Sequence, residues 1–299
     1  MVGLYREYEY WVAAVQLILA MLGMGAGLQV ADFQKVVAQP KAVTVGLIMQ
    51  LVIVPVIALA FILYTNLPPG MIIGIAIIAA IPGGTISNVF TLMARGNVPL
   101  SISITALTSV ACLLTTPLIL ELLIADYMTD SFAMPVLRIA TEIGLFLLVP
   151  LLLGMVFLRQ LPAYAKQFST LCVRGSLLGI AMIALGSLGA GRLDMTGTPV
   201  TDIALLFGFI IGLTIVGLWL TKAFGLAQHD NTAIEMEVTV RNINLGFLLK
   251  ASLFPLVAGV ENPLADMVLL SLLLYGSWQL VMGAVFIFWR RKQAEAACQ

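Results

Sequence analysis

Long apolar runs, separated by short polar or Pro/Gly-rich clusters, recur along the whole chain. A helix needs about 20 mostly apolar residues to cross a bilayer. Runs of this length predict nine membrane spans, of which the eighth is the least apolar. The spans cover approximately residues 10–30, 42–64, 70–94, 98–124, 136–158, 169–190, 201–223, 232–256 and 263–289.

The composition supports a membrane protein and limits its chemistry. The chain has 299 residues, of which 61% are hydrophobic and 10% are charged, whereas a soluble domain is about 45–50% apolar and about 25% charged. The net charge is zero, so nothing predicts binding to nucleic acid. His229 is the only histidine, which excludes a histidine-based cluster of transition-metal ligands. We therefore expect an all-α polytopic protein of the cell membrane, embedded in a lipid bilayer, with no obligate protein partner evident.

Positive charges are distributed unevenly between alternate loops, and this asymmetry predicts the orientation of the chain. Ten lysines and arginines lie on one side if the number of spans is odd: Lys35, Lys41, Arg95, Arg159, Lys166, Arg174, Lys222, Arg290, Arg291 and Lys292. The other side has Arg6, Arg138 and Arg192. Nine spans with the N-terminus outside and the C-terminus in the cytoplasm satisfy the rule. Lys250, near the outer end of its span, is expected to extend its ammonium group to the membrane surface.

Two of the predicted spans have polar centres that should break a helix. Residues 81–88 read Ile-Pro-Gly-Gly-Thr-Ile-Ser-Asn, and residues 235–246 contain two glutamates, an arginine and two asparagines. Proline lacks an N–H and glycine weakens a helix, so backbone groups are freed that need protein or water as partners. Paired interruptions of this kind indicate a transporter site. Because the two spans lie five apart, an odd number, we expect inverted five-helix repeats with the first helix missing.

Side-chain oxygens near the two breaks suit sodium, a hard cation that prefers oxygen ligands. Ser87 and Asn88 follow the first break. Ser101 and Thr105 are four residues apart and therefore share one face of the next span. Glu237 supplies a negative charge within the second break.

Structural interpretations of the same residues remain open. Serines and threonines in membrane helices commonly pack between helices or bond to backbone. Glu237 and Arg241 are four residues apart and would face each other as a buried ion pair on a continuous helix. Gln50, inside the second span, offers a further carboxamide oxygen that fits either interpretation.

The residues at these breaks resemble those of the bile acid:sodium symporter family. The match is carried by residues 82–89, by Ala94-Arg95-Gly96-Asn97 and Leu100-Ser101, and by Glu237 with Asn242. The resemblance implies two crossing discontinuous helices in a core domain and a smaller panel domain. We expect the panel at approximately residues 10–30 and 136–190 and the core at approximately 42–124 and 201–289, within a single transporter unit that covers 1–299.

The resemblance also implies roles for individual residues. The first sodium site would consist of Ser87, Asn88, Ser101, Thr105 and Glu237. The second would use Gln50, Glu237 and the carbonyls around Val238 and Val240. Thr85 and Asn242 would face the substrate cavity, and Gln279 falls where some relatives have histidine.

One residue departs from the family pattern. The family has glutamine at the position of Arg241, and a guanidinium has donors only, so Arg241 cannot be a sodium ligand. One hypothesis is that the guanidinium occupies or repels the second sodium site. The rival is that Arg241 faces the cavity and binds a carboxylate or sulfonate of the substrate.

The sequence thus predicts a secondary active transporter that moves an organic anion, such as a bile acid-like or small carboxylate solute, inward with Na+ by alternating access. A proton-coupled or uncoupled anion carrier on the same fold is the alternative, with Glu237 titrating in place of sodium binding. An intramembrane enzyme that uses Glu237 as an acid or base is a third class, but the sequence contains no visible nucleophile–base pair.

Overall fold

The computed structural model describes residues 2–32, 40–128, 133–193, 198–256 and 260–296, and Lys35 lies outside these ranges. The regular elements of the described chain are all helical. They are α1 (Val2–Gly25), α3 (Pro40–Ile48), the π-helical turn η1 (Met49–Ile53), α4 (Val54–Tyr64), α5 (Pro69–Ala80), α6 (Thr85–Met93), α7 (Val98–Ile124), the 3-10 turn η2 (Ala125–Tyr127), α8 (Val136–Ile143), the π-helical turn η3 (Gly144–Leu148), α9 (Val149–Gln160), α10 (Pro162–Gly189), α11 (Val200–Ala223), α12 (Gln228–Thr239), α13 (Ile243–Leu253) and α14 (Pro263–Ala296).

Seven continuous helical segments of the described chain are long and apolar enough to cross a membrane. The all-helical, multi-pass class predicted from the sequence is therefore confirmed. The predicted spans 70–94 and 232–256 are each divided into two shorter helices, α5 with α6 and α12 with α13. The apolar parts of these spans, Pro69–Ala80 and Ile243–Leu253, are too short to cross a bilayer alone. Nine crossings and an inverted repeat remain predictions.

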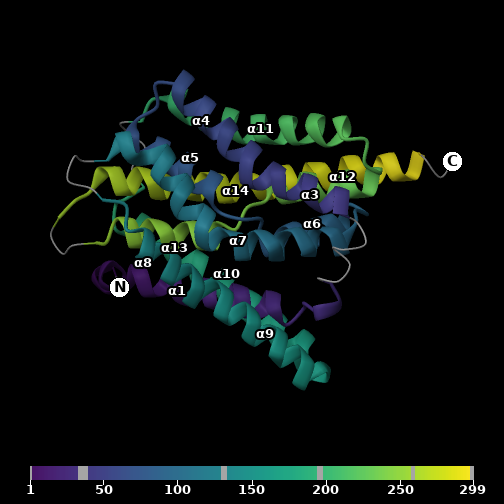
Figure 1. The fold of residues 1–299 in the computed structure, drawn as a ribbon. Coiled ribbons are helices and arrows are strands. Elements are labelled where there is room, and N and C mark those ends of the chain that lie inside the picture. The colour runs from purple at the N-terminus through teal and green to yellow at the C-terminus, as the bar shows by residue number, and fades with distance from the viewer. Residues whose placement is uncertain (1, 33–39, 129–132, 194–197, 257–259, 297–299) are drawn as a thin grey trace.

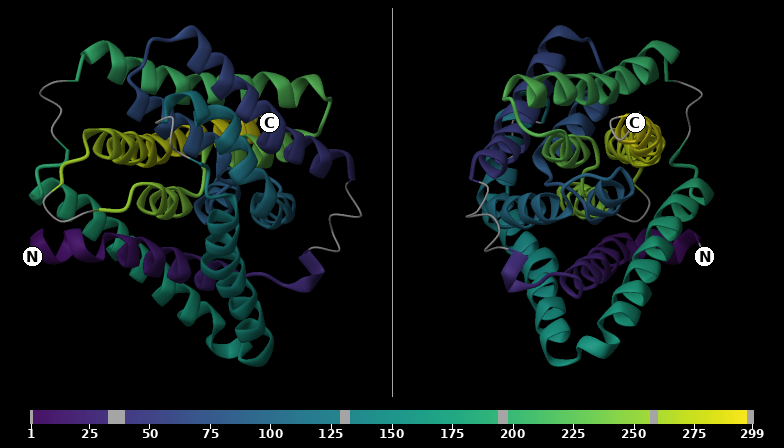
Figure 2. Two further views of the ribbon diagram at one scale, coloured as in Figure 1. Left: turned by 60° about the vertical axis from the view of Figure 1, so that its left-hand side comes forward. Right: turned by 90° about the vertical axis from the view of Figure 1, so that its right-hand side faces the viewer.

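Helices α1, α9 and α10 lie together along one side of the molecule (Figure 1). Figure 2 shows α9 and α10 as the two arms of a V, with α1 lying across them. Glycines let these helices approach closely, as is usual between membrane helices. A Cβ added at Gly25 would lie 2.0 Å from the carbonyl oxygen of Leu151, and one at Gly179 would lie 2.4 Å from Cβ of Gln16. The residues predicted for a panel domain fall mostly in this group of helices.

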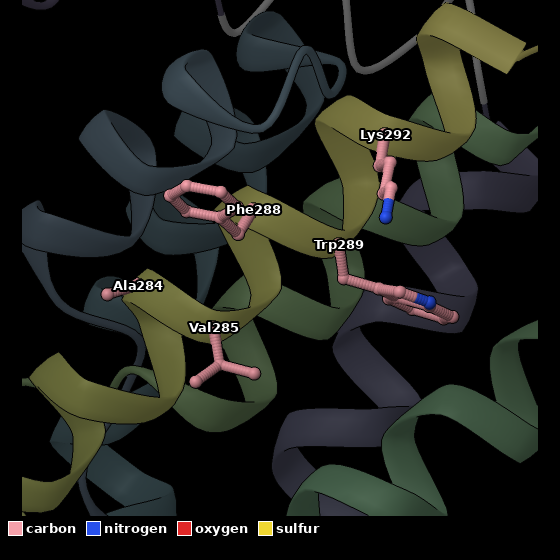
Figure 3. Close-up of a pocket in the computed structure, with 5 residues that line it drawn as sticks. All are labelled: Ala284, Val285, Phe288, Trp289 and Lys292. Atoms are coloured by element: carbon pink, nitrogen blue, oxygen red, sulfur yellow. The ribbon is translucent and has the colours of Figure 1, made fainter.

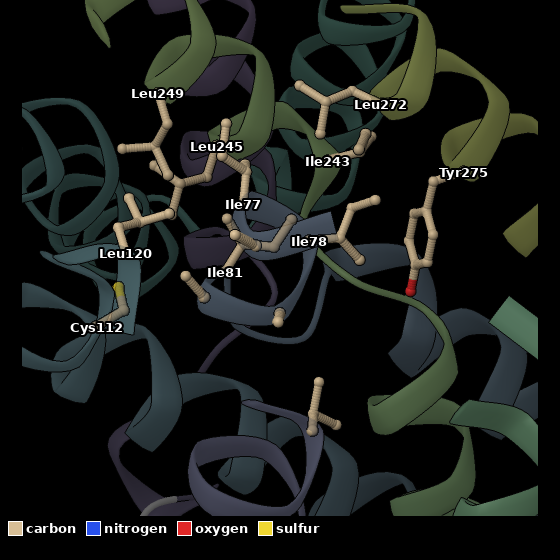
Figure 4. Packing of buried hydrophobic residues seen from close by; sticks show 14 of the residues in the cluster. Ile77, Ile78, Ile81, Cys112, Leu120, Ile243, Leu245, Leu249, Leu272 and Tyr275 are labelled. Atoms are coloured by element: carbon tan, nitrogen blue, oxygen red, sulfur yellow. The ribbon is translucent and has the colours of Figure 1, made fainter. Parts of the chain in front are cut away.

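Helix α5 is one of the most deeply buried elements of the remaining group, together with α13. Eleven of its 12 residues are buried. Figure 4 shows Ile77 and Ile78 of α5 packed among apolar side chains of α7, α13 and α14. Gly70 and Gly74 bring α14 close, because a Cβ at Gly74 would lie 2.5 Å from Cβ of Ser271. Inside a bilayer this close fit stabilises through van der Waals contact, since lipid tails are as apolar as the side chains that they would replace.

Four charged residues form a buried cluster that joins the two groups of helices. Glu9 of α1 pairs with Lys250 of α13 at 2.9 Å and with Arg192 at 3.0 Å, and Arg192 also pairs with Asp266 of α14 at 2.5 Å. Lys250 is only 1% exposed. The expectation that its ammonium group extends to the surface is therefore wrong, because the carboxylate of Glu9 neutralises it inside the protein.

Removing the carboxylate of this cluster should destabilise the fold. We expect Glu9→Gln to lower the free energy of unfolding by about 3–5 kcal/mol, since it leaves a buried cation without its partner. Lys250→Met should cost less, because Glu9 keeps Arg192. The thermal midpoint of the purified protein in detergent measures both, and Glu121→Gln at an exposed carboxylate is the matched control. Equal midpoints for Glu9→Gln and Glu121→Gln would contradict a stabilising role of the cluster.

Candidate functional site

The two helix breaks meet at the centre of the larger group of helices. The N–H of Gly84 donates to the carbonyl of Val240 at 3.0 Å, and the N–H of Asn242 donates to the carbonyl of Pro82 at 2.9 Å. Gly83 and Arg241 form an isolated antiparallel bridge between the two segments. Each break thus supplies the hydrogen-bond partners that the other has lost, which is the condition for irregular backbone at membrane depth.

Two glycines are required at this crossing because no space is left for a side chain. A Cβ at Gly83 would lie 2.1 Å from a carboxylate oxygen of Glu237. A Cβ at Gly84 would lie 2.9 Å from the carbonyl oxygen of Arg241 and 3.3 Å from Cα of Asn242. The Pro82-Gly83-Gly84 sequence therefore both ends α5 and admits the second chain segment.

Glu237, in the last turn of α12, has its carboxylate directly beside the crossing. Its Oε1 atom accepts hydrogen bonds from Ser101 at 2.7 Å, from Thr105 at 2.8 Å and from Ser87. Its Oε2 atom accepts from Thr105 at 2.8 Å and from the carboxamide of Gln50 at 3.1 Å. Glu237 is 0% exposed. Helices α6 and α7 and the turn η1 thus all converge on one buried carboxylate.

Asn88 completes a cluster of side-chain oxygens from three helices. Its Oδ1 atom lies 2.8 Å from the hydroxyl oxygen of Ser101 and 3.5 Å from that of Thr105. The structure therefore brings together Ser87, Asn88, Ser101, Thr105 and Glu237. A carboxylate, three hydroxyls and a carboxamide oxygen form a ligand set that suits a hard cation such as sodium.

The residues predicted for a second sodium site also lie near this carboxylate. Gln50 contacts its Oε2 atom, and Val238 and Val240 follow Glu237 in the chain. Gln50 is in the π-helical turn η1, a type of irregularity that is frequent at functional sites. Its Oε1 atom accepts from the N–H of Gly83 at 2.8 Å, while its Nε2 atom donates to Glu237. Val238 is buried in α12, and the carbonyl of Val240 accepts from Gly84. Gln50 and the carbonyl of Val240 thus stabilise the crossing through their hydrogen bonds.

Arg241 makes no ion pair with Glu237 among the described residues. Helix α12 ends at Thr239, so residues 237 and 241 do not share a helix face. The guanidinium instead donates to carbonyls of α5: Nε to Ile78 at 3.2 Å and Nη2 to Ala79 at 3.0 Å. The ion pair that a continuous helix would make is thus prevented by the break.

The residues predicted to face the substrate lie at or near the crossing. Thr85 is the half-buried first residue of α6. Asn242 caps α13 by accepting from the N–H of Leu245 at 3.4 Å, and Gln279 of α14 accepts from the N–H of Arg241 at 3.0 Å. Asn242 and Gln279 therefore also hold the broken backbone in place.

Sequence reasoning missed a second set of buried polar groups beside the crossing. Gln16 of α1 donates to the carbonyl of Asn244 at 2.9 Å and lies 3.5 Å from the hydroxyl of Ser176. The side-chain oxygen of Asn244 is buried without a hydrogen-bond partner in the described chain. A glutamine inside an otherwise apolar first span was the available signal. These groups lie where α1 and α10 meet α13.

A hollow of about 460 Å³ on the surface of α14 is unrelated to these polar groups. Figure 3 shows its lining of Ala284, Val285, Phe288, Trp289 and Lys292. Val285 and Phe288 are exposed, as expected for a surface in contact with lipid tails. A tryptophan and a lysine at the end of an apolar stripe are typical of the membrane–water interface. This hollow carries none of the candidate ion ligands.

The chain is similar to known sodium-dependent transporters. A family model described as the Sodium Bile acid symporter family matches residues 14–192. The uncharacterized sodium-dependent transporter YocS of Bacillus subtilis (strain 168) is 26% identical over 94% of this chain and 85% of its own length. The probable sodium/metabolite cotransporter BASS1, chloroplastic, of Arabidopsis thaliana is 30% identical over 86% of this chain, which spans only 65% of that protein. The ileal sodium/bile acid cotransporter of Homo sapiens is 25% identical over 92% of this chain and 77% of its own length.

The close approach at the crossing can be tested with one added methyl group. Gly84→Ala should lower the thermal midpoint, because its Cβ meets the backbone of Arg241 and overpacking of a tight site costs about 1–3 kcal/mol. Gly208→Ala in α11 is the matched control, since nothing lies within 4 Å of its added Cβ. We expect that control to be neutral or slightly stabilising, because alanine favours a helix over glycine. A Gly84→Ala protein as stable as Gly208→Ala would contradict the crossing geometry.

Proposed function

Because the chain belongs to the sodium bile acid symporter family, we propose that it is a sodium-coupled symporter that carries an organic anion by alternating access. The sodium dependence in the names of its relatives supports the ion, and the bile acid cotransporter among them supports an anionic solute. Membership of a family of transporters also argues against an enzyme.

The carboxylate of Glu237 is the observation that carries this proposal. It is completely buried and bonded to hydroxyls and a carboxamide, and no cationic side chain of the described chain lies within salt-bridge distance. A carboxylate at bilayer depth is costly unless a positive charge accompanies it. A sodium ion among the oxygens of Glu237, Ser87, Asn88, Ser101 and Thr105 would supply that charge. The hydroxyls can turn their lone pairs from one another toward the ion, since each can both donate and accept.

The resemblance implies a second sodium site formed by Gln50, Glu237 and the carbonyls around Val238 and Val240. The contacts of Gln50 with Glu237 and Gly83 fit a role in positioning this side of the carboxylate. Arg241 adds a fixed positive charge to the same crossing, which disfavours a second ion there.

The substrate, in this proposal, lies beside the crossing. Helices α6 and α13 both begin there, at Thr85 and Ile243. Helix N-termini carry partial positive charge and unpaired N–H groups, which favour an anion. Thr85 and Asn242 are the side chains best placed to contact it, with Gln279 and Arg241 behind them.

Transport would proceed by rocking of two groups of helices against each other. We propose that α1, α8, α9 and α10 form the panel and that the remaining helices form the core, as the resemblance implies. The N-terminus lies outside and the C-terminus in the cytoplasm in this scheme, with nine crossings of the cell membrane. Such motion around a site near the membrane centre is the usual mechanism of secondary transporters.

Removing the charge or an oxygen of the cluster tests the proposed sodium site. We expect Glu237→Gln to abolish sodium-dependent uptake of bile acids and small carboxylates into proteoliposomes. Ser101→Ala should weaken sodium affinity about ten-fold or more, since losing a hydrogen-bond partner of a charged group costs about 1.5–3 kcal/mol. Thr108→Val is the matched control on the same helix, because the Thr108 hydroxyl donates only to carbonyls of α7 at 2.8 Å and 3.1 Å.

Replacing sodium by choline in the same assay separates the proposal from its alternative. Uptake that disappears in choline supports sodium coupling. Uptake that persists in choline and follows an imposed proton gradient would replace it with proton-coupled transport through Glu237. Unaltered sodium-dependent uptake by Glu237→Gln would remove this residue from the mechanism.

A further inference from the structure

The guanidinium of Arg241 completes the hydrogen bonding at the C-terminal end of α5. The last four carbonyls of a helix lack partners within it. In α5, the carbonyl of Ile77 accepts from the N–H of Ile81 at 3.1 Å, and that of Ala80 accepts from Thr116 at 2.8 Å. Arg241 donates to the two between them, Ile78 at 3.2 Å and Ala79 at 3.0 Å. Its Nη2 atom also donates to the carbonyl of Ile81.

This arrangement places a fixed positive charge where a helix end is negative. Carbonyls at a helix C-terminus carry partial negative charge, which favours a cation. Arg241 is 2% exposed and has no carboxylate within salt-bridge distance in the described chain. An arginine side chain stays charged in proteins, so this cation is always present. The guanidinium thus supplies the positive charge and the hydrogen-bond donors that these carbonyl oxygens would otherwise lack.

We infer that Arg241 is a built-in cation of the crossing, which takes the place of one bound sodium ion and leaves the Glu237 cluster as the single sodium site. This inference rests on the proposed function. It makes Arg241 the residue that determines how many ions accompany one substrate molecule.

The charges at the crossing give the consequence for transport. Glu237 contributes one negative charge and Arg241 one positive charge, so the site without ions is neutral. One bound sodium ion makes it positive, and a monovalent anionic substrate makes it neutral again. The loaded carrier then crosses between its two states without net charge, which avoids the cost of moving charge through the bilayer. One sodium ion with one monovalent anion is therefore the expected stoichiometry, and transport should be electroneutral.

Replacing Arg241 by glutamine should create a site for a second sodium ion at the C-terminal end of α5. Arg241→Gln removes the positive charge and leaves the carbonyls of Ile78, Ala79 and Ile81 without this donor. These oxygens and the new carboxamide oxygen form an all-oxygen ligand set for a hard cation. The crossing then carries the negative charge of Glu237 and no fixed positive charge. Arg241→Lys is the matched control, since it retains the positive charge with a different shape.

Sodium binding to the purified full-length protein tests this directly. Radioactive sodium in equilibrium dialysis gives the number of ions bound, and sodium-dependent thermal stabilisation gives a Hill coefficient that cannot exceed the number of sites. We expect about one ion for the wild type and Arg241→Lys, and about two ions with a Hill coefficient above one for Arg241→Gln. A purely structural role for Arg241 would change the thermal midpoint in choline but not the number of ions.

The outcomes separate this inference from the proposed function. Two sodium ions bound to the wild type, or a single ion bound to a folded Arg241→Gln protein, would overturn the inference alone. The wild-type count decides the question even if Arg241→Gln does not fold. Absence of sodium binding in all three proteins would overturn both the inference and the proposed symport.

Discussion

The structure depends on one constraint, which is that broken backbone inside a membrane must find hydrogen-bond partners within the protein. Two interrupted helices meet this constraint by bonding to each other, through the pairs Gly84–Val240 and Asn242–Pro82. Glycine is required at the contact because the second segment fills the space of a side chain. The half-helices α6 and α13 begin at this point, so partial positive charge is available at the centre of the molecule.

The break also separates two charges that are close in sequence. On a continuous helix, Glu237 and Arg241 would face each other and form a buried ion pair. Because α12 ends at Thr239, the carboxylate faces hydroxyls of α6 and α7, while the guanidinium faces carbonyls of α5. In the proposed mechanism the carboxylate binds a mobile sodium ion, and the guanidinium takes the place of a second one.

Much of this arrangement was predictable from the sequence, because it is encoded locally. Apolar runs marked the helices, and Pro82 with Gly83 and Gly84 marked the first break. The family resemblance grouped Glu237 with hydroxyls more than 130 residues away, and these side chains lie together in the structure. The direction of Arg241 was not predictable, since it depends on backbone angles after the break. Contacts such as Glu9 with Lys250, which are 241 residues apart, have no local signal at all.

The location of these groups also constrains how sodium binding can be coupled to transport in the proposed mechanism. The side chains of the Glu237 cluster come from α6, α7 and α12, which the proposal assigns to the core, so rocking of α1, α8, α9 and α10 would not pull the cluster apart. Sodium can then favour one state only if its binding changes the crossing itself. Gln50 provides such a link, because it bonds to both Glu237 and the backbone of Gly83. A shift of the carboxylate on binding sodium would pass through Gln50 to the break. There Asn242 contacts Met21 of α1, and the carbonyl of Asn244 accepts from Gln16 of α1. In the proposed mechanism, the broken helices are thus both the binding site and the element through which an ion biases the two states.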